Sequence, residues 1–223
     1  MPPTLQIVPP KLTFPETIAG QSSNPLTVTL TAAGGPVQLE SIATFGSPSS
    51  PAGFTQTNNC PVAGALAPGG SCAISVTFTP KAIAIQGQLL ISDNASGNPQ
   101  TVVLTGIGEI AILTAAPATL NFGELLANHT SAPKRVMLTN KGNLAAQIAG
   151  VTVLEPFKIA TGANTCSGKT IKPDGTCSFD VEYAPTIAGS ASEQPVDVAY
   201  NGTSPAIMVA GVSPPKIGPP PHL

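Results

Sequence analysis

Apolar and polar residues alternate along most of the chain, and no long segment repeats with the spacing of a helix. In residues 26–31 leucine and valine alternate with threonine, and residues 72–79 and 177–184 repeat this pattern with aromatic residues on the apolar side. Side chains of a strand point to opposite faces in turn, so the alternation predicts strands with one buried face. Cys72 and Cys177 fall on the apolar side, and their sulfur atoms are expected inside the core.

Turn-forming residues divide the alternating segments into short strands. Strands are predicted near 4–8, 11–14, 25–32, 36–45, 53–57, 71–79, 86–92, 100–107, 110–114, 118–122, 133–139, 144–154, 156–160, 176–184, 190–200 and 205–212. Residues 93–98 and the pair Asn201-Gly202 are predicted to form hairpin turns. Proline cannot continue a central strand, so Pro80 and Pro185 are expected to end the strands before them. Many short strands spaced by turns predict antiparallel, immunoglobulin-like β-sandwiches.

The pattern occurs twice along the chain. Cys60 and Cys72 flank one loop that contains Pro-Gly, and Cys166 and Cys177 flank a similar loop with Pro-Asp-Gly. An offset of about 105 residues relates the two copies, which suits a whole sandwich domain and is too long for a solenoid repeat. The fold class expected is therefore all-β, with two tandem sandwich domains.

The expected domains are residues 1–108 and 109–212, followed by a proline-rich tail or linker at 213–223. The last strand of the first copy continues into the second copy with no flexible linker, so little movement between the domains is expected. The tail is expected to be an extended spacer similar to polyproline. Its alternative interpretations are a stub toward a further domain and a docking arm.

The composition argues for a folded chain with an uncharged polar surface. Hydrophobic residues make up 42% of the 223 residues, whereas charged residues make up only 9%, with a net charge of −2. Charged residues usually contribute about 25% of a globular domain. Nucleic acid and anionic membrane surfaces require a basic surface, so neither is an expected partner. No apolar segment is long enough for a membrane helix, and weak charge repulsion favours self-association.

The four cysteines favour export. Each pair has its own loop, and neither histidine of the chain lies near a pair, so a zinc site with four ligands is not expected. A redox pair would have the Cys-x-x-Cys spacing. Structural disulfides Cys60–Cys72 and Cys166–Cys177 are therefore predicted, and an extracellular or cell-surface location with them, although no signal peptide is present.

The motifs of both copies resemble a known family of repeats. Each copy carries Leu-x-Phe near its start (Leu12 to Phe14; Leu120 to Phe122), a Val-x-Leu-Thr strand, and a Pro-Gly or Asp-Gly turn followed by Ser-Cys or Thr-Cys and an alternating strand that ends at proline. This resembles the bacterial choice-of-anchor D repeats, which are related to ASPM–SPD-2–Hydin (ASH)-like immunoglobulin-fold domains. The second copy departs from the pattern where its closing Gly-x-Gly is replaced by Gly211-Val-Ser213. The resemblance implies tandem modules of exported bacterial proteins and implies no catalytic residues.

Few residues are candidates for catalysis or metal binding. His129 lies in a polar loop and His222 in the tail, and both are interpreted as solvated. Asp180 and Glu182 could form a pair of carboxylates, but they are interpreted as a solvated strand face. Asp93 and Asn94 could contribute oxygen ligands to calcium, although EF-hand spacing is absent. No catalytic, cofactor or metal site is predicted, and no cofactor is expected.

Other polar residues suggest modification or binding. Asn94, Asn128 and Asn201 match the glycosylation pattern but are interpreted as turn residues. An isopeptide bond from a lysine such as Lys134 is conceivable, but the disulfides already supply that role. The chain has no Trp and two Tyr, of which one, at position 183, is expected to point inward. This scarcity argues against a carbohydrate site built on exposed aromatic rings.

The expected function is that of a non-enzymatic structural or interaction module of an exported bacterial protein, acting as a stiff spacer or as a subunit of a surface assembly. Protein partners or further copies of the chain would bind at sheet edges. One alternative is an adhesin or a carbohydrate- or protein-binding module, with an extracellular polymer as its ligand. A second alternative is a scaffold of the cytoskeletal or ciliary kind.

Overall fold

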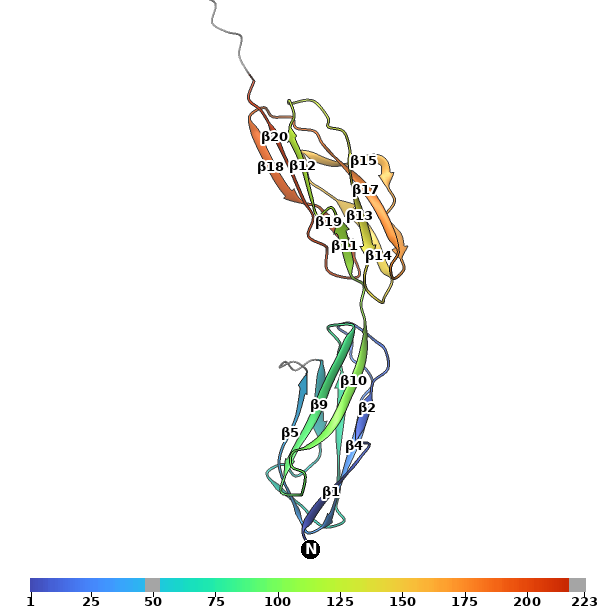
Figure 1. Cartoon of the computed structure of the whole chain (residues 1–223), viewed down its shortest axis with the longest axis vertical. Helices are drawn as coiled ribbons and strands as arrows, with labels where there is room; N and C mark the ends of the chain where they lie inside the picture. Colours follow the sequence, from blue (N-terminus) through green and yellow to red (C-terminus); the bar gives the residue numbers. More distant parts are fainter. Residues whose placement is uncertain (47–52, 217–223) are drawn as a thin grey trace, which may run out of the picture. The chain divides into compact units, whose positions relative to one another are not determined.

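The computed structural model describes residues 1–46 and 53–216 (Figure 1). The chain divides into two compact units, Met1–Ile110 and Ala111–Leu223. Every helix or strand assigned in the described residues is a β-strand, and each unit contains one disulfide. The prediction of an all-β chain with two immunoglobulin-like sandwiches and one disulfide in each is confirmed.

The first unit is a sandwich of two sheets. Its strands are β1 (Pro3–Val8), β2 (Lys11–Thr13), β3 (Thr17–Ile18), β4 (Leu26–Gly34), β5 (Val37–Gly46), β6 (Phe54–Asn58), β7 (Gly64–Leu66), β8 (Ser71–Phe78), β9 (Ala84–Asp93) and β10 (Gln100–Glu109). One sheet has the order β1-β4-β8-β6, and the other has the order β2-β10-β9-β5-β7, with β3 also beside β10. The short strands β2 and β3 run parallel to β10, and the other pairs are antiparallel.

The second unit repeats this plan with one change. Its strands are β11 (Leu113–Ala116), β12 (Thr119–Glu124), β13 (Lys134–Asn140), β14 (Ala146–Thr152), β15 (Phe157–Asn164), β16 (Lys169–Ile171), β17 (Thr176–Tyr183), β18 (Ser190–Pro195), β19 (Asp197–Tyr200) and β20 (Met208–Ser213). One sheet has the order β11-β13-β17-β15. The opposite layer is divided into two sheets, β12-β20-β18 and β16-β14-β19.

This division corrects the prediction of a single strand over 190–200. Residues 190–195 form β18 and pair with β20, whereas residues 197–200 form β19 and pair with β14. The corresponding strand of the first unit, β9, pairs with both neighbours because β5 has 10 residues. In the second unit the counterpart of β5 is β14, which has only 7 residues and ends at Thr152. Pro195 lies at the junction of the two segments, and it cannot donate a ladder hydrogen bond there because it has no N–H group.

The apolar faces predicted from alternation form a separate core in each unit. Cys72 and Cys177 are buried on the same strand faces as the apolar residues, as expected. Three aromatic rings meet in each core: Phe14, Phe54 and Phe78 in the first, and Phe122, Phe157 and Tyr183 in the second. The ring of Tyr183 lies against Gly211, where an added Cβ would come within 2.8 Å of it. Glycine therefore permits the close approach of the two sheets at this point.

The prediction of a hairpin at Asn201-Gly202 is wrong. The strands on either side, β19 and β20, are separated by residues 201–207 and lie in different sheets. The Asn201 side chain accepts a hydrogen bond from the Gln147 N–H at 2.7 Å and donates one to the Ala145 carbonyl at 3.1 Å. Asn201 thus fastens the loop to the neighbouring strand, which is a role that a dipeptide motif does not reveal.

Candidate functional site

The two disulfides occupy the same place in both units. Cys60 and Cys72 have Cα atoms 5.0 Å apart, and those of Cys166 and Cys177 are 5.2 Å apart. In each unit the bond joins residues that follow and begin adjacent strands of one sheet, whereas the short strand between them pairs with the opposite layer. The closed loop therefore connects the two layers. The strands β7 and β16 within these loops were not predicted, because three residues are too few to show alternation.

An asparagine side chain forms a local hydrogen bond at the start of each disulfide loop. Asn58 Oδ1 accepts the N–H of Cys60 at 3.0 Å, and Asn164 Oδ1 accepts the N–H of Cys166 at 2.9 Å. This local bond turns the backbone two residues after the asparagine. The first cysteine is thereby directed toward the core in both units.

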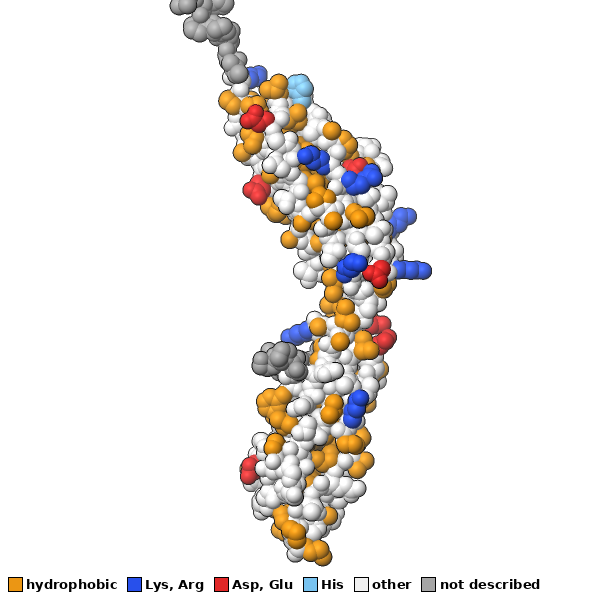
Figure 2. Space-filling view, viewed as in Figure 1, with side chains coloured by type: hydrophobic (Ala, Val, Ile, Leu, Met, Phe, Trp, Pro, Cys, Tyr) orange, Lys and Arg blue, Asp and Glu red, His pale blue; other side chains and the backbone are white. Residues whose placement is uncertain are grey.

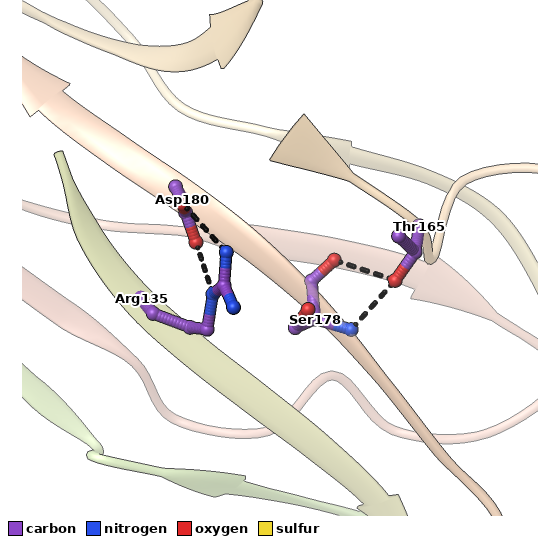
Figure 3. A network of polar contacts seen from close by, with 4 residues as sticks. All are labelled: Arg135, Thr165, Ser178 and Asp180. Carbon is purple, nitrogen blue, oxygen red and sulfur yellow. Dashed lines mark hydrogen bonds and ion pairs between the residues drawn. The ribbon is translucent and has the colours of Figure 1, made fainter. Parts of the chain in front are cut away.

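The candidate carboxylates on β17 are engaged in ion pairs, of which Figure 3 shows the one between Asp180 and Arg135. Arg135 donates to both oxygens of Asp180, at 2.8 and 3.1 Å, from the facing position on β13. These hydrogen bonds lower the pKa of Asp180, and they outweigh the raising effect of its burial. Glu182 pairs with Lys158 on β15 at 3.2 Å. A carboxylate whose pKa is lowered, as that of Asp180 is, is poorly suited to acid–base catalysis, which requires a group that exchanges protons near neutral pH.

The interpretation of Asp180 as a solvated residue is wrong, because it is largely buried beneath Arg135. A second polar contact lies beside this pair in Figure 3, where Thr165 Oγ1 donates to the Ser178 carbonyl and accepts the Ser178 N–H, both at 2.9 Å. Thr165 directly precedes Cys166. The network therefore fastens the start of the disulfide loop to β17.

The candidate calcium ligands have structural partners. Asp93 is buried, and its Oδ1 accepts the N–H of Ala95 at 2.6 Å. Burial raises the pKa of Asp93, and hydrogen bonds from Ala95 and Gln100 oppose this effect. Asn94 Oδ1 accepts the N–H of Gln38 at 2.9 Å, as Asn201 does for Gln147 in the second unit. Within residues 1–46 and 53–216, no group of three His, Cys, Asp or Glu side chains is placed to hold a metal ion.

The remaining candidates are dispersed. His129 is exposed in its loop, and its Nδ1 lies 3.2 Å from the Ala127 carbonyl, while His222 lies outside the described residues. Lys134 donates to the Asn121 carbonyl at 2.6 Å and lies 5.4 Å from the centre of the Phe122 ring. That contact involves main-chain oxygen, so it is not the geometry of an isopeptide bond. No helix among the described residues could cross a membrane.

A groove on the second unit was not predicted. It has a volume of about 420 Å³, within the range of about 300–1,000 Å³ that is usual for ligand sites. It is lined by the start of β15 with the residues before it, by the residues that follow β17, and by β18. Its lining residues are Glu155, Pro156, Phe157, Lys158, Ala184, Pro185, Thr186, Ile187, Ser190 and Ser192.

The inward positions of β18 are polar, whereas those of its counterpart are apolar. Strand β18 faces the interior with Ser190, Ser192 and Gln194. In the first unit the equivalent positions are those that face the last residues of β10. They hold Ile83, Ile85 and Gly87. Two serine side chains thus replace two isoleucines, and this exchange leaves room and hydroxyl groups at the groove.

Two further hydroxyl groups distinguish the same end of the second unit. Tyr183 and Ser213 stand where the first unit has Phe78 and Gly108. Both are buried, and their hydroxyl oxygens have no partner among the described protein atoms. Ser213 pairs with the groove residue Ser190, and Tyr183 packs on Gly211, which pairs with Ser192. An alignment of the two repeats, compared at the inward-facing positions of matching strands, would have revealed these extra hydroxyl groups in the sequence.

The fold and its disulfides define the class of the protein as a pair of immunoglobulin-like sandwich domains. Residues 111–210 match the family model described as HYDIN/CFA65/VesB-like, Ig-like domain. The second domain therefore belongs to this ASH-like immunoglobulin-fold family, and the family expected from the sequence motifs is confirmed. A search of curated proteins finds no match.

Solved structures with a similar arrangement are distant in sequence. A protein of unknown function from Porphyromonas gingivalis W83 is 13% identical, with 93% of this chain and 99% of that chain covered and a TM-score of 0.38. A domain of human CEP192, described as ASH/PapD-like, is 18% identical, with 47% and 84% covered and a TM-score of 0.36. The secreted serine protease VesC from Vibrio cholerae is 14% identical, with 79% and 45% covered and a TM-score of 0.34.

Proposed function

We propose that this chain is a non-catalytic structural and interaction module of an exported protein, acting as a spacer or as a subunit of a surface assembly. The observation that carries the proposal is that each sandwich closes its own core and is cross-linked by its own disulfide. Structural disulfides persist in oxidising compartments, which supports an extracellular location. The candidate catalytic carboxylates are already occupied by ion pairs.

The surface supports contacts with neutral partners. Figure 2 shows charged side chains scattered over the visible face, with uncharged polar or backbone atoms and groups of apolar side chains between them. With charged residues at only 9% of the chain, repulsion between copies is weak. Free sheet edges then become available to a neighbouring molecule. Such a neighbour could be a protein partner or a second copy of the chain.

A second candidate function is that of a binding module attached to a larger secreted protein. The groove on the second domain favours it, because a concave site of ordinary ligand size combines hydroxyl groups with apolar rims. Ile187 at this groove is 69% exposed, and an apolar side chain so exposed is available to a partner.

Negative-stain electron microscopy of the oxidised chain over a concentration series tests the assembly role. Filaments or regular polymers at high concentration are expected for an assembly subunit. Discrete two-lobed particles at every concentration would contradict assembly and leave the spacer or binding role.

Thiol quantification of native material tests the location. No free thiol is expected for an exported chain, since all four cysteines are paired in the structure. Free thiols in native material would instead favour the cytoskeletal or ciliary scaffold.

A further inference from the structure

Strand β18 has a free edge beside the groove. Among the described residues it pairs with β20 on one side and with no strand on the other. Its counterpart β9 pairs with β10 on one side and, from Gly87 onward, with β5 on the other. Because β14 ends at Thr152, its described pairing covers no residue of β18, whereas in the first domain the residues before Gly87 are the ones without a β5 partner. An unpaired edge is a template for an added strand.

The phase of the ladder identifies the free backbone groups. The N–H of Val196 donates to the Ile207 carbonyl at 2.9 Å, so this pair is of the hydrogen-bonded kind. Such pairs alternate along antiparallel strands, and Ser190 and Ser192 consequently direct their backbone groups toward β20. Ala191 and Glu193 direct their N–H and C=O groups away from β20, to the free edge. Pro195 has no N–H, so it limits the usable edge at that end.

The groove runs alongside this edge and has little net charge. Ser190 and Ser192 line it from β18, and Thr186 and Ile187 line it from the loop after β17. Of its two charged residues, Lys158 is paired with Glu182 at 3.2 Å. Ser190 Oγ already donates to the Ile187 carbonyl at 2.7 Å. A ligand here would therefore receive hydrogen bonds from the Ser192 hydroxyl and from backbone groups, and it would pack on proline and isoleucine side chains.

Hydrogen bonds from Gln194 fasten the walls of the groove to each other. The side-chain amide of Gln194 donates to the carbonyls of Leu154 and Glu155, and it thereby joins β18 to the opposite wall. The connection that forms this wall is short, comprising residues 153–156 between β14 and β15. A site fastened in this way requires little ordering when a ligand binds.

We infer that the groove binds an extended peptide with small, uncharged side chains, which adds a strand to β18 at Ala191 and Glu193. This inference deepens the binding role proposed above and rests on it. The backbone of the peptide would pair with the two free residues, while its alternate side chains would enter the groove over Ala184 and Ile187. A polysaccharide would use the hydroxyl groups but would leave the edge amides unpaired.

The test begins with a phage-displayed library of random peptides, panned on the intact oxidised chain. Enriched peptides are then titrated into the chain labelled with ¹⁵N. The expected result is a set of uncharged peptides that perturb the amides of Ala191 and Glu193 and slow their exchange. Peptides with N-methyl groups at alternate positions should lose binding, because methylation removes the donors that pair with the edge.

Two variants separate edge pairing from other contacts. Glu193→Pro removes the free-edge N–H without disturbing the bonds to β20, and affinity should fall about tenfold. Glu193→Thr keeps the N–H and removes the charge, and affinity should stay near that of the wild type. Replacing Ser190 and Ser192 by isoleucine, as in the first domain, should fill the groove and weaken binding. Tyrosine fluorescence reports whether each variant has a folded second domain, since both tyrosines lie there.

Three outcomes would overturn the inference: no peptide enriched, perturbations confined to another face, or equal losses for Glu193→Pro and Glu193→Thr. A glycan that binds the groove without protecting the Ala191 amide would also overturn it. None of these outcomes decides whether the chain polymerises, which electron microscopy measures separately. The failure of this inference is thus distinguishable from the failure of the assembly or spacer role.

Discussion

Tyr183 is the largest fully buried side chain among residues 1–46 and 53–216, and its hydroxyl has no partner among the described protein atoms. Burial raises the pKa of Tyr183, so the phenol stays neutral beyond its usual range. The equivalent Phe78 fills the same place in the first domain without a hydroxyl. Replacement of Tyr183 by phenylalanine should therefore stabilise the second domain by about 1 kcal/mol, since an unsatisfied buried group is removed. Chemical denaturation followed by the fluorescence of Tyr200 measures the change.

Tyr200 provides the matched control for this prediction. Its hydroxyl accepts the N–H of Leu113 at 3.1 Å and donates to the Thr203 carbonyl at 2.8 Å. Tyr200→Phe should destabilise the domain by about 1 kcal/mol, because both partners lose a hydrogen bond. If both substitutions changed stability in the same direction, the hydroxyl partners would not explain the difference.

Asp93 and Asp180 should give opposite dependences of stability on pH. Burial raises the pKa of Asp93 in the folded state, so its stabilising contribution is present below the unfolded pKa and is lost as pH rises through the folded pKa. Arg135 lowers the pKa of Asp180, so its contribution is present above the unfolded pKa and is lost as pH falls through the folded pKa.

Substitution by asparagine isolates each effect. Relative to the wild type, Asp93→Asn should become more favourable as pH rises through the acid range, whereas Asp180→Asn should become less favourable over the same range. Far-UV circular dichroism measured against denaturant at several pH values reports both variants. Parallel curves for the wild type and either variant would contradict the assigned direction of that pKa shift.

At the scale of elements, each disulfide connects two adjacent strands of one sheet through a loop that also reaches the opposite layer. Replacing Cys166 and Cys177 by alanine opens a loop with a sequence separation of 11. The second domain should lose about 3 kcal/mol of stability, because the unfolded chain gains conformational entropy when the cross-link is removed. The tyrosine signal measures this loss directly.

The same replacement at Cys60 and Cys72 is the control. It should leave the midpoint of the tyrosine transition in place, because both tyrosines belong to the second domain. A shift of that midpoint would mean that the first domain stabilises the second one.

At the scale of the whole molecule, the two core clusters share no residue. We therefore expect two transitions on unfolding, with circular dichroism reporting both domains and tyrosine fluorescence reporting the second. Traces that do not coincide over a denaturant titration would demonstrate independent domains. Coincidence of the two traces at all denaturant concentrations would instead indicate one cooperative unit.

The alternation of residues by itself determined the sandwich, the buried face of each long strand and the inward position of both second cysteines, because a period of two residues reports which face is buried. The repeated motif determined that the fold occurs twice, and together with the absence of nearby histidines it predicted the disulfide pairs. These features depend on near neighbours in the chain, so they are legible in the sequence.

Only the tertiary structure decided which edges remain unpaired. Strand β14 ends at Thr152 and Pro195 interrupts the next strand, so the layer of the second domain divides and leaves β18 with a free edge. The burial of Asp180 also depends on Arg135 from a neighbouring strand. The free edge and the burial of Asp180 both depend on strands that are distant in the chain. The local pattern of residues does not indicate where a neighbouring strand ends.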